Sequence, residues 1–234
     1  MVKKLLSRYE TFFRQSRLGK EIFLTLRVPN PTVEKAEAKI LLETLESIPR
    51  SFDASKLFYS QDIAPIFEVI VPMAATAESI DRIYRYYSDF VVGKQHKSFK
   101  EGDITIADWI GEFKPSTVNV IPLFEEMGYM LEAHNITKEY LKDKKVKYQR
   151  VFLAHSDPAM NYGMINSMLL NKIALQRLHK MSKDIGVEIY PILGLGSAPF
   201  RGNLTPHNVQ HVLNEFPSVQ TFTIQSAFKY DHAP

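Results

Sequence analysis

Hydrophobic positions follow two alternating patterns along the whole chain. Short apolar runs, rich in β-branched side chains, are each followed by a polar turn and then by a longer stretch with apolar residues at helical spacing. Several runs are apolar at almost every position, which is typical of strands buried on both faces of a parallel sheet. The predicted strands are EIFLTLRV (21–28), IFEVIVPM (66–73), VNVIPLFE (118–125), RVFLAHSD (150–157), VEIYPILG (187–194) and VQTFTIQS (219–226).

The stretches between these runs carry helix signals. Asn30 before Pro31 and Thr205 before Pro206 each predict a helix N-cap with proline at the first helical position. Gly186 predicts the end of a helix. Apolar stripes predict the bodies of two helices, with Ile80, Ile83, Tyr84 and Tyr87 in one and Ile165, Met168, Leu169, Ile173, Leu175 and Leu178 in the other.

The alternation of strands and helices predicts an α/β fold. Polar, chemically capable residues stand at the carboxyl ends of most predicted strands, and a barrel gathers such ends at one mouth, whereas an open doubly wound sheet spreads them along an edge. We therefore favour a TIM (β/α)8 barrel, with residues 1–234 in a single domain because no low-complexity linker divides them. About six βα units fall short of eight, so we expect an incomplete barrel from a chain that looks cut at both ends.

Composition narrows the classes of function. Of the residues, 45% are hydrophobic and 24% are charged, which suits a globular chain, and the absence of cysteine leaves oxygen or imidazole as metal ligands. A hard cation such as Mg²⁺ is favoured. The net charge of +3 is small, and the lysine cluster at 142–147 has Tyr148 as its one close aromatic residue, so we expect no nucleic-acid partner. Without a long apolar run or a signal-peptide pattern, we expect no membrane contact and a cytosolic location.

Two carboxylates end neighbouring strands. Glu125 closes the third predicted strand and Asp157 closes the fourth. In a barrel these strands are adjacent, so both carboxylates can bind one Mg²⁺ together with substrate oxygens and water. The alternative is that either carboxylate caps the helix that follows it. The presence of both favours the metal site.

A glycine-containing segment, Gly194–Asn203, lies between a predicted strand and a predicted helix. Its backbone amides at Gly196 and Ser197, together with Arg201, are suited to bind a phosphate or a carboxylate. The spacing matches neither a dinucleotide fingerprint nor a P-loop. Taken alone, the segment fits an anion site and a plain structural turn equally well.

Three further residues are candidates for chemistry. Arg27 interrupts an apolar run near a strand end, where it either binds an anion or pairs with a neighbouring acid. His155 is a candidate acid or base, although a hydrogen-bonded histidine at a strand end is the stronger interpretation. His96 lies among lysines in a polar loop, which we interpret as a lid over an anionic substrate rather than a solvated excursion.

Seven segments occur together in the order of one known family: LTLRVPNP, VGKQHKSF, DITIADWIGEFKP, NVIPLFEE, HSDPAMNYG, GLGSAPFRGNLTP and TFTIQSAFKYD. Across essentially its whole length the chain resembles archaeal-type phosphoenolpyruvate carboxylase. The resemblance implies a Mg²⁺-dependent reaction in which bicarbonate attacks the phosphorus of phosphoenolpyruvate, giving carboxyphosphate and the pyruvate enolate. Released CO₂ then joins the enolate to form oxaloacetate. It also implies a homotetramer for the intact protein.

The resemblance implies roles for particular residues. Glu125 in PLFEE and Asp157 in HSDP match the metal-binding carboxylates of the PLFET and YSDS motifs of larger relatives. Arg201 matches the second of two arginines in their glycine-rich loop, and Arg27 matches an arginine that binds substrate phosphate. Gln225 matches a glutamine in a less specific motif. We therefore expect Arg201, Arg27 and His155 to be catalytic, and Arg27, Arg201, Gly196, Ser197 and Gln225 to bind substrate.

The chain also departs from that pattern. Leu195 stands where the first loop arginine is expected, and Met160 replaces a lysine that follows the aspartate. The segment with a histidine-proline motif, expected to supply the acid/base histidine, and a C-terminal portion have no counterpart in these residues. We therefore expect these residues alone to be inactive. Two alternatives stay open: a Mg²⁺-dependent aldolase or lyase acting through a pyruvate enolate, and a non-enzymatic barrel fragment that needs a partner chain.

Overall fold

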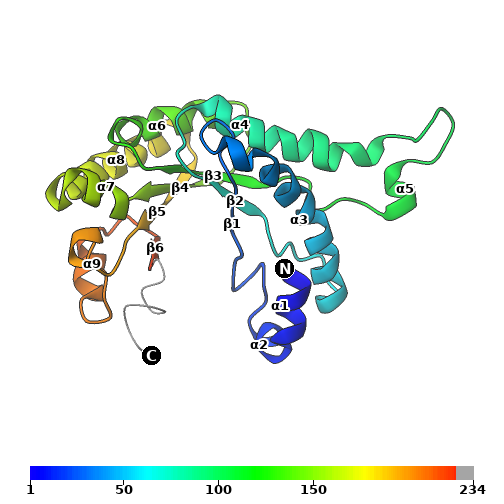
Figure 1. The fold of residues 1–234 in the computed structure, drawn as a ribbon, viewed down its shortest axis with the longest axis horizontal. Coiled ribbons are helices and arrows are strands. Elements are labelled where there is room, and N and C mark those ends of the chain that lie inside the picture. The colour runs from blue at the N-terminus through cyan, green and yellow to red at the C-terminus, as the bar shows by residue number, and fades with distance from the viewer. Residues whose placement is uncertain (225–234) are drawn as a thin grey trace. The chain divides into compact units, whose positions relative to one another are not determined.

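The computed structural model describes residues 1–224 (Figure 1). Their contacts divide the chain into two compact units. Unit 1 comprises residues 1–71 and 79–120, and unit 2 comprises residues 72–78 and the chain from 121 onward. The strands are β1 (Leu26–Arg27), β2 (Glu68–Val71), β3 (Asn119–Phe124), β4 (Tyr148–Ala154), β5 (Glu188–Gly194) and β6 (Thr221–Thr223).

Strand order confirms the predicted fold class. The strands follow chain order from β1 to β6, and the registers β1 with β2, β3 with β4, β4 with β5 and β5 with β6 are all parallel. A doubly wound sheet would reverse its order at a switch point, whereas a barrel adds each strand beside the last. The chain therefore forms an incomplete α/β barrel of six strands. All six predicted strands are present, although β1 is reduced to two residues.

Unit 1 is built around its longest helix. Its helical segments are α1 (Val2–Arg8), α2 (Glu10–Gln15), η1 (Lys35–Glu37), α3 (Ala38–Tyr59), most of α4 (Ala77–Arg85), η2 (Tyr86–Val92), η3 (Gly93–His96) and α5 (Ile106–Ile110). The predicted stripe runs through α4 into η2: Ile80 and Ile83 of α4 and Tyr87 of η2 are buried, and Tyr84 is half-buried. Leu45 and Ile48 of α3 are also fully buried, so apolar positions at helical spacing form the core of this unit.

Both predicted Xaa-Pro helix starts are wrong. Asn30 Oδ1 accepts from the backbone N and the hydroxyl of Thr32 at 3.1 and 2.6 Å, so the side chain closes a local turn, and α3 begins only at Ala38. Thr205 likewise precedes a turn rather than a helix, since α9 begins at Val209 with Asn208 as its N-cap. Side chains of this type compete with helix formation by bonding nearby backbone groups.

In unit 2 helices flank the parallel strands. These helices are α6 (Met127–Leu141), α7 (Ser156–Tyr162), α8 (Met164–Ile185), η4 (Pro199–Arg201) and α9 (Val209–Glu215) (Figure 1). Along β4, Gln149, Val151 and Leu153 are buried and alternate with residues that are only partly buried. This period of two shows that one face of the strand is packed and the other is more open.

Helix α8 buries a different face from the predicted one. Leu175 and Leu178 are buried as predicted, but Ile165, Leu169 and Ile173 are exposed. Small and polar side chains lie against the strands instead, and Asn171 Nδ2 donates to Ala154 O at 3.1 Å. A small contact face lets the helix approach the backbone of β4 closely. Gly186 ends α8 at φ 69° as predicted, in the left-handed conformation that glycine adopts without strain.

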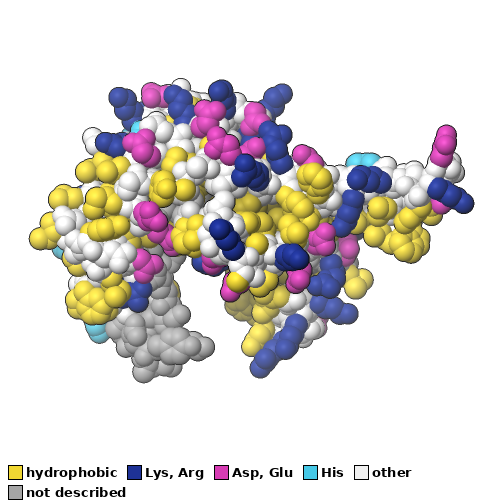
Figure 2. Space-filling model, turned by 45° about the horizontal axis from the view of Figure 1, so that its top comes forward, with side chains coloured by type: hydrophobic (Ala, Val, Ile, Leu, Met, Phe, Trp, Pro, Cys, Tyr) yellow, Lys and Arg dark blue, Asp and Glu magenta, His cyan; other side chains and the backbone are white. Residues whose placement is uncertain are grey.

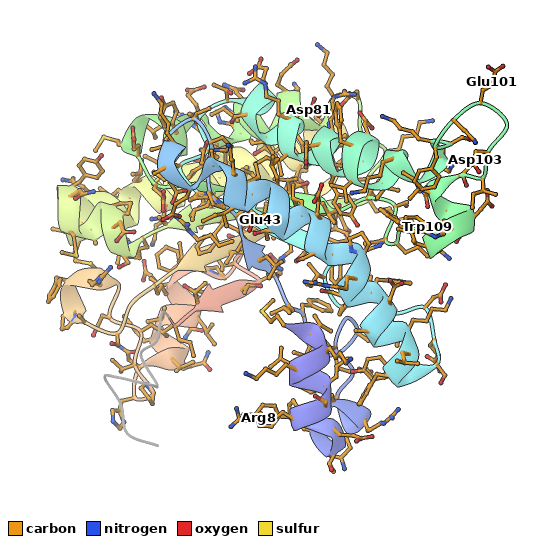
Figure 3. All side chains as sticks on the ribbon, turned by 45° about the vertical axis from the view of Figure 1, so that its right-hand side comes forward. Arg8, Glu43, Asp81, Glu101, Asp103 and Trp109 are labelled. Carbon is orange, nitrogen blue, oxygen red and sulfur yellow. The ribbon has the colours of Figure 1, made fainter. Side chains whose placement is uncertain are left out.

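Residues 93–111 of unit 1, here called the arm, form a hairpin with its own internal bonds. Ser98 and Thr105 make an antiparallel bridge, and Thr105 and Asp108 form a capping box at the start of α5. Figure 3 shows Glu101 and Asp103 in the turn of the arm and Trp109 on α5. Exposed apolar side chains gather on the arm (Figure 2), among them Phe99, Ile104, Trp109 and Ile110. None of the helices in residues 1–224 is long and apolar enough to cross a bilayer.

Candidate functional site

The proposed metal carboxylates stand at the ends of two paired strands in unit 2. The register of β3 and β4 places Phe124 opposite Leu153, so Glu125 follows directly at the end of β3. Asp157 lies in the first turn of α7, four residues beyond that register point on β4. Parallel pairing therefore brings the two strand ends to the same edge of the sheet, as the sequence predicts. A shared metal remains a prediction.

Glu125 also organises the loop that follows β2. Its Oε2 accepts from Met73 N at 3.0 Å, while Ala74 N donates to Leu123 O at 3.0 Å. Met73 has a φ of 50°, which a non-glycine side chain rarely adopts. The carboxylate thus accepts from an amide that is held in an uncommon conformation, and this contact fixes the direction of the Glu125 side chain.

Asp157 and Arg201 form an ion pair across a gap of 44 residues in sequence, with Arg201 Nη2 and Asp157 Oδ1 separated by 3.1 Å. Arg201 Nε also donates to Ser156 Oγ at 2.6 Å. The side chains of Arg201 and Asp157 are 40% and 54% exposed, whereas Ser156 is buried. The buried hydroxyl of Ser156 therefore holds the solvent-facing guanidinium of Arg201, which in turn pairs with the solvent-facing carboxylate of Asp157.

The segment after β5 is closed by its own backbone. Gly196 N donates to Arg201 O at 2.8 Å, and Leu204 N donates to Gly196 O at 3.1 Å. The Gly196 amide is therefore committed to the loop, so this residue contributes shape rather than a donor for substrate. Gly202 has a φ of 117°, and a Cβ built there would lie 2.5 Å from Leu195 Cδ2. Ser197 is buried within the same loop.

His155 is held in the interior beside α8. Its Nδ1 is hydrogen-bonded to Ser167 Oγ, which in turn donates to His155 O at 2.9 Å, and the residue is 1% exposed. The ring also meets Phe216 edge to face. Burial lowers the pKa of the imidazole below its usual value. This geometry favours the hydrogen-bonded strand-end histidine over an acid or base, and the catalytic role stays a prediction.

Arg27 belongs to unit 1 and pairs with a near neighbour. Its Nη2 lies 3.2 Å from Glu34 Oε1, and the Arg27 side chain is 54% exposed. Glu34 is itself fixed, because its Oε2 accepts from Asn30 N at 2.8 Å. The ion pair anticipated as the alternative to anion binding is therefore present. Gln225 lies outside the described residues.

The donor set of unit 2 fits a hard divalent cation with few protein ligands. Glu125 and Asp157 offer carboxylate oxygens, and within residues 1–224 no group of three or more His, Cys, Asp or Glu side chains is placed to hold a metal ion. Mg²⁺ is commonly held by one or two carboxylates, with water and substrate oxygens completing its octahedron. Zn²⁺ would require a fuller set of protein ligands.

Comparisons with known proteins decide the family. A family profile described as "Phosphoenolpyruvate carboxylase" matches residues 1–234. This chain belongs to the phosphoenolpyruvate carboxylase family. It is 59% identical to the phosphoenolpyruvate carboxylase of Methanospirillum hungatei over 99% of this chain and 48% of that protein. It is 58% identical to the enzyme of Methanothermobacter thermautotrophicus over 100% of this chain and 48% of that protein. The chain thus spans about half the length of the curated relatives that it matches.

Two residues of this candidate site were not predicted from the sequence. Ser156 contacts Arg201 across 45 residues, and Met73 contacts Glu125 across 52 residues. Ser156 adjoins the predicted Asp157, so its position in the HSDP segment was a usable signal. No sequence signal pointed to Met73, because its backbone amide, not its side chain, bonds to Glu125, and the direction of that amide depends on a positive φ.

Proposed function

We propose that the protein containing this chain catalyses the Mg²⁺-dependent carboxylation of phosphoenolpyruvate by bicarbonate, giving oxaloacetate and phosphate. This chain would supply the metal and phosphate contacts of that site. The observation that carries the proposal is the Asp157–Arg201 pair at a strand end, in a chain that matches the family along its whole length. A carboxylate and a guanidinium side by side offer one group to a metal and another to the phosphate of the same substrate.

Each residue has a proposed task. Glu125 and Asp157 would hold Mg²⁺, which when bound would neutralise charge on the phosphate and on the developing enolate. Arg201 would bind a phosphate oxygen through its N–H groups that do not face α7. The closed loop around Gly196 and Ser197 would fix the backbone of Arg201, because the amide of Gly196 donates to the carbonyl of Arg201. Preorganised donors of this kind stabilise charge without reorganisation during the reaction.

Electron flow in the proposed reaction balances without any oxidant or reductant. A bicarbonate oxygen attacks the phosphorus, and the bond between phosphorus and the enol oxygen breaks. The products of this step are carboxyphosphate and the enolate of pyruvate. Carboxyphosphate then releases CO₂ and phosphate, and the enolate carbon forms a bond to CO₂. Exclusion of water from the enolate is required, because a proton would otherwise give pyruvate.

The intact protein is expected to act in the cytosol and to assemble as a homo-oligomer, in line with the family resemblance. Arg27 and Gln225 are proposed as further substrate contacts. For Arg27 this requires that a substrate anion compete with Glu34 for the guanidinium. Substitution of Glu34 by glutamine should therefore lower the KM for phosphoenolpyruvate if Arg27 binds it.

The reaction is tested with the intact protein, phosphoenolpyruvate, Mg²⁺ and ¹⁸O-labelled bicarbonate. We expect phosphate release that depends on bicarbonate, one labelled oxygen in the phosphate, and oxaloacetate trapped by reduction to malate. Label enters phosphate because the attacking bicarbonate oxygen stays on phosphorus when carboxyphosphate breaks down. An aldolase or lyase would release no phosphate. Unlabelled phosphate formed without bicarbonate would contradict the proposal.

A further inference from the structure

The guanidinium of Arg201 is held along one edge by two consecutive residues of α7. Nε donates to Ser156 Oγ at 2.6 Å, and Nη2 donates to Asp157 Oδ1 at 3.1 Å. Nε and Nη2 lie on the same side of the planar group, which carries five N–H donors in a fixed arrangement. The protein therefore uses the Nε–Nη2 edge. Within residues 1–224 no further hydrogen bond is made along the Nη1–Nη2 edge, so this edge can meet a ligand.

Ser156 is the fixed point of this arrangement. Its residue is 1% exposed, whereas the Arg201 and Asp157 side chains are 40% and 54% exposed. An exposed ion pair orients its partners weakly, because water competes for both charges and two long side chains lose rotational freedom. A short hydrogen bond from a charged donor to a buried acceptor is stronger. The serine hydroxyl therefore determines where the guanidinium lies.

The serine also determines how Arg201 meets Asp157. With Nε bound to Ser156, the hydrogen bond between Arg201 and Asp157 involves the oxygen Oδ1. Without the hydroxyl, Nε and Nη2 would be free to bind both carboxylate oxygens in the bidentate geometry that arginine and carboxylates favour. A bidentate pair would compete with a cation for Asp157, because each carboxylate oxygen would already accept a hydrogen bond.

We propose that Ser156 is a positioning residue that keeps Arg201 on a single oxygen of Asp157, so that the carboxylate and the guanidinium can bind a divalent cation and a phosphate at the same time. The inference rests on the proposed function for its substrate. It makes a separate claim about metal affinity, which can be measured without substrate. Ser156 acts through Arg201 and Asp157 and touches neither ligand.

The test compares Ser156→Ala with Ser156→Thr in the intact protein. Mn²⁺ serves as the probe, since it binds oxygen ligands and its free concentration is read by electron paramagnetic resonance. We expect the alanine variant to lose about tenfold in Mn²⁺ affinity and to need about tenfold more phosphoenolpyruvate for half-maximal rate, which is the scale of one hydrogen bond to a charged group. The threonine variant keeps the hydroxyl and should stay near the unmodified protein in both measurements.

A double-mutant cycle with Arg201→Lys assigns the effect to the guanidinium. Lysine carries its charge on one nitrogen and has no Nε–Nη2 edge for the serine to hold. Ser156→Ala should therefore cause no further loss of Mn²⁺ affinity in the Arg201→Lys background, which is the signature of coupled residues. Additive losses in the two variants would overturn the proposal.

Two further results would overturn it. One is an alanine variant with unchanged Mn²⁺ affinity and unchanged KM. The other is a threonine variant as impaired as the alanine variant, with a matching fall in Tm, which would make Ser156 a packing residue only. Failure of the proposed function can be told apart from failure of the Ser156 proposal. If the unmodified protein releases no bicarbonate-dependent phosphate, the proposed function is wrong, while the Mn²⁺ measurements still test the role of Ser156.

Discussion

The loop after β5 and the arm both contain glycine and basic side chains. They differ in how firmly their side chains are held and in how much apolar surface they expose. In residues 194–204 the backbone bonds to itself, Leu195 and Ser197 are buried, and Arg201 is held by Ser156 and Asp157. In the arm, the apolar side chains of Phe99 and Trp109 are more than half exposed. A loop that orders a charged side chain against a buried partner is suited to bind an anion. The arm is joined to the rest of unit 1 near its base, where Lys94 pairs with Glu46 and Gln95 accepts from Phe113 N, and its outer part leaves apolar side chains exposed.

This difference bears on the sequence argument for the arm. Lysines around His96 suggested a lid over an anionic substrate, and in the structure the arm exposes aromatic side chains such as Phe99 and Trp109 as well as Lys97 and Lys100. The lid stays a prediction. Ranked from the largest expected effect to the smallest, the following substitutions test whether function depends on the anchored loop of unit 2 and not on the arm.

Asp157→Asn should have the largest effect. The amide keeps the shape of the side chain but removes the charge that a cation and Arg201 both require. We expect kcat/KM to fall on the order of a thousandfold, the upper range for losing one preorganised electrostatic contact, and the Mg²⁺ concentration for half-maximal rate to rise. Steady-state rates across a Mg²⁺ titration measure both. Unchanged metal dependence would remove Asp157 from the metal site.

Arg201→Lys should cost on the order of tenfold to a thousandfold in kcat/KM, because lysine retains the charge but loses the planar edge that binds phosphate oxygens. Arg8→Lys is the matched control, since Arg8 lies in α1 of unit 1 and faces solvent (Figure 3). The control should leave the rate unchanged. Equal activity of Arg201→Lys would reduce the loop to a structural turn.

A glycine pair compares the two excursions directly. Gly202 and Gly102 have φ values of 117° and 76°, but a Cβ at Gly202 would lie 2.5 Å from Leu195 Cδ2, whereas a Cβ at Gly102 meets nothing within 4 Å. Gly202→Ala should therefore lower the free energy of unfolding by roughly 2–3 kcal/mol, as strain is added to overpacking. Gly102→Ala should cost roughly 1 kcal/mol, the penalty for the left-handed conformation alone. Urea denaturation of both variants measures the difference. Equal losses would show that the loop tolerates a side chain.

The pH dependence of stability tests the position of His155. Burial lowers the pKa of the folded imidazole, so the unfolded state binds a proton first as the pH falls below about 6.5. Stability should thus be complete above that pH and decline below it, by at most about 1.4 kcal/mol per pH unit for one proton. His155→Gln should flatten this part of the profile. Denaturant midpoints between pH 5 and 8 report it, and identical slopes would mean that His155 titrates normally.

Prediction from sequence succeeded where periodicity or local chemistry decides the structure. All six strands and the helix end at Gly186 follow from apolar runs and from a glycine in the left-handed region. It failed where an asparagine side chain closes a local turn: Asn30 Oδ1 accepts from Thr32 N, and Asn208 Oδ1 accepts from Thr205 N, so neither Asn30 nor Thr205 starts a helix. It also failed on α8, where Ser167 and Asn171 are buried because they bond to the end of β4.

The candidate site was also predictable only in part. Strand ends could be predicted, because parallel strands in chain order bring their carboxyl ends to one edge. The contact from Ser156 to Arg201 could not, because it joins residues 45 positions apart and depends on the path of the loop after β5. Sequence placed Glu125 and Asp157 at adjacent strand ends. It did not show which of the candidate arginines bonds to a carboxylate of the site and which bonds elsewhere.

Trp109→Ala should have the smallest effect of the series. The indole is 65% exposed and meets Phe99 edge to face, with ring centroids 5.3 Å apart, so its loss should remove roughly 0.5–1.5 kcal/mol within the arm. The capping box of Thr105 and Asp108 would still hold α5. Because unfolding of the arm does not require unfolding of the core of unit 1, we expect the main thermal transition and kcat to stay unchanged. Hydrogen exchange should quicken at residues 105–110 alone. A fall of several degrees in Tm would show that the aromatic side chains of the arm are covered in the intact protein. A loss of activity as large as that of Arg201→Lys would show that the arm is needed for function.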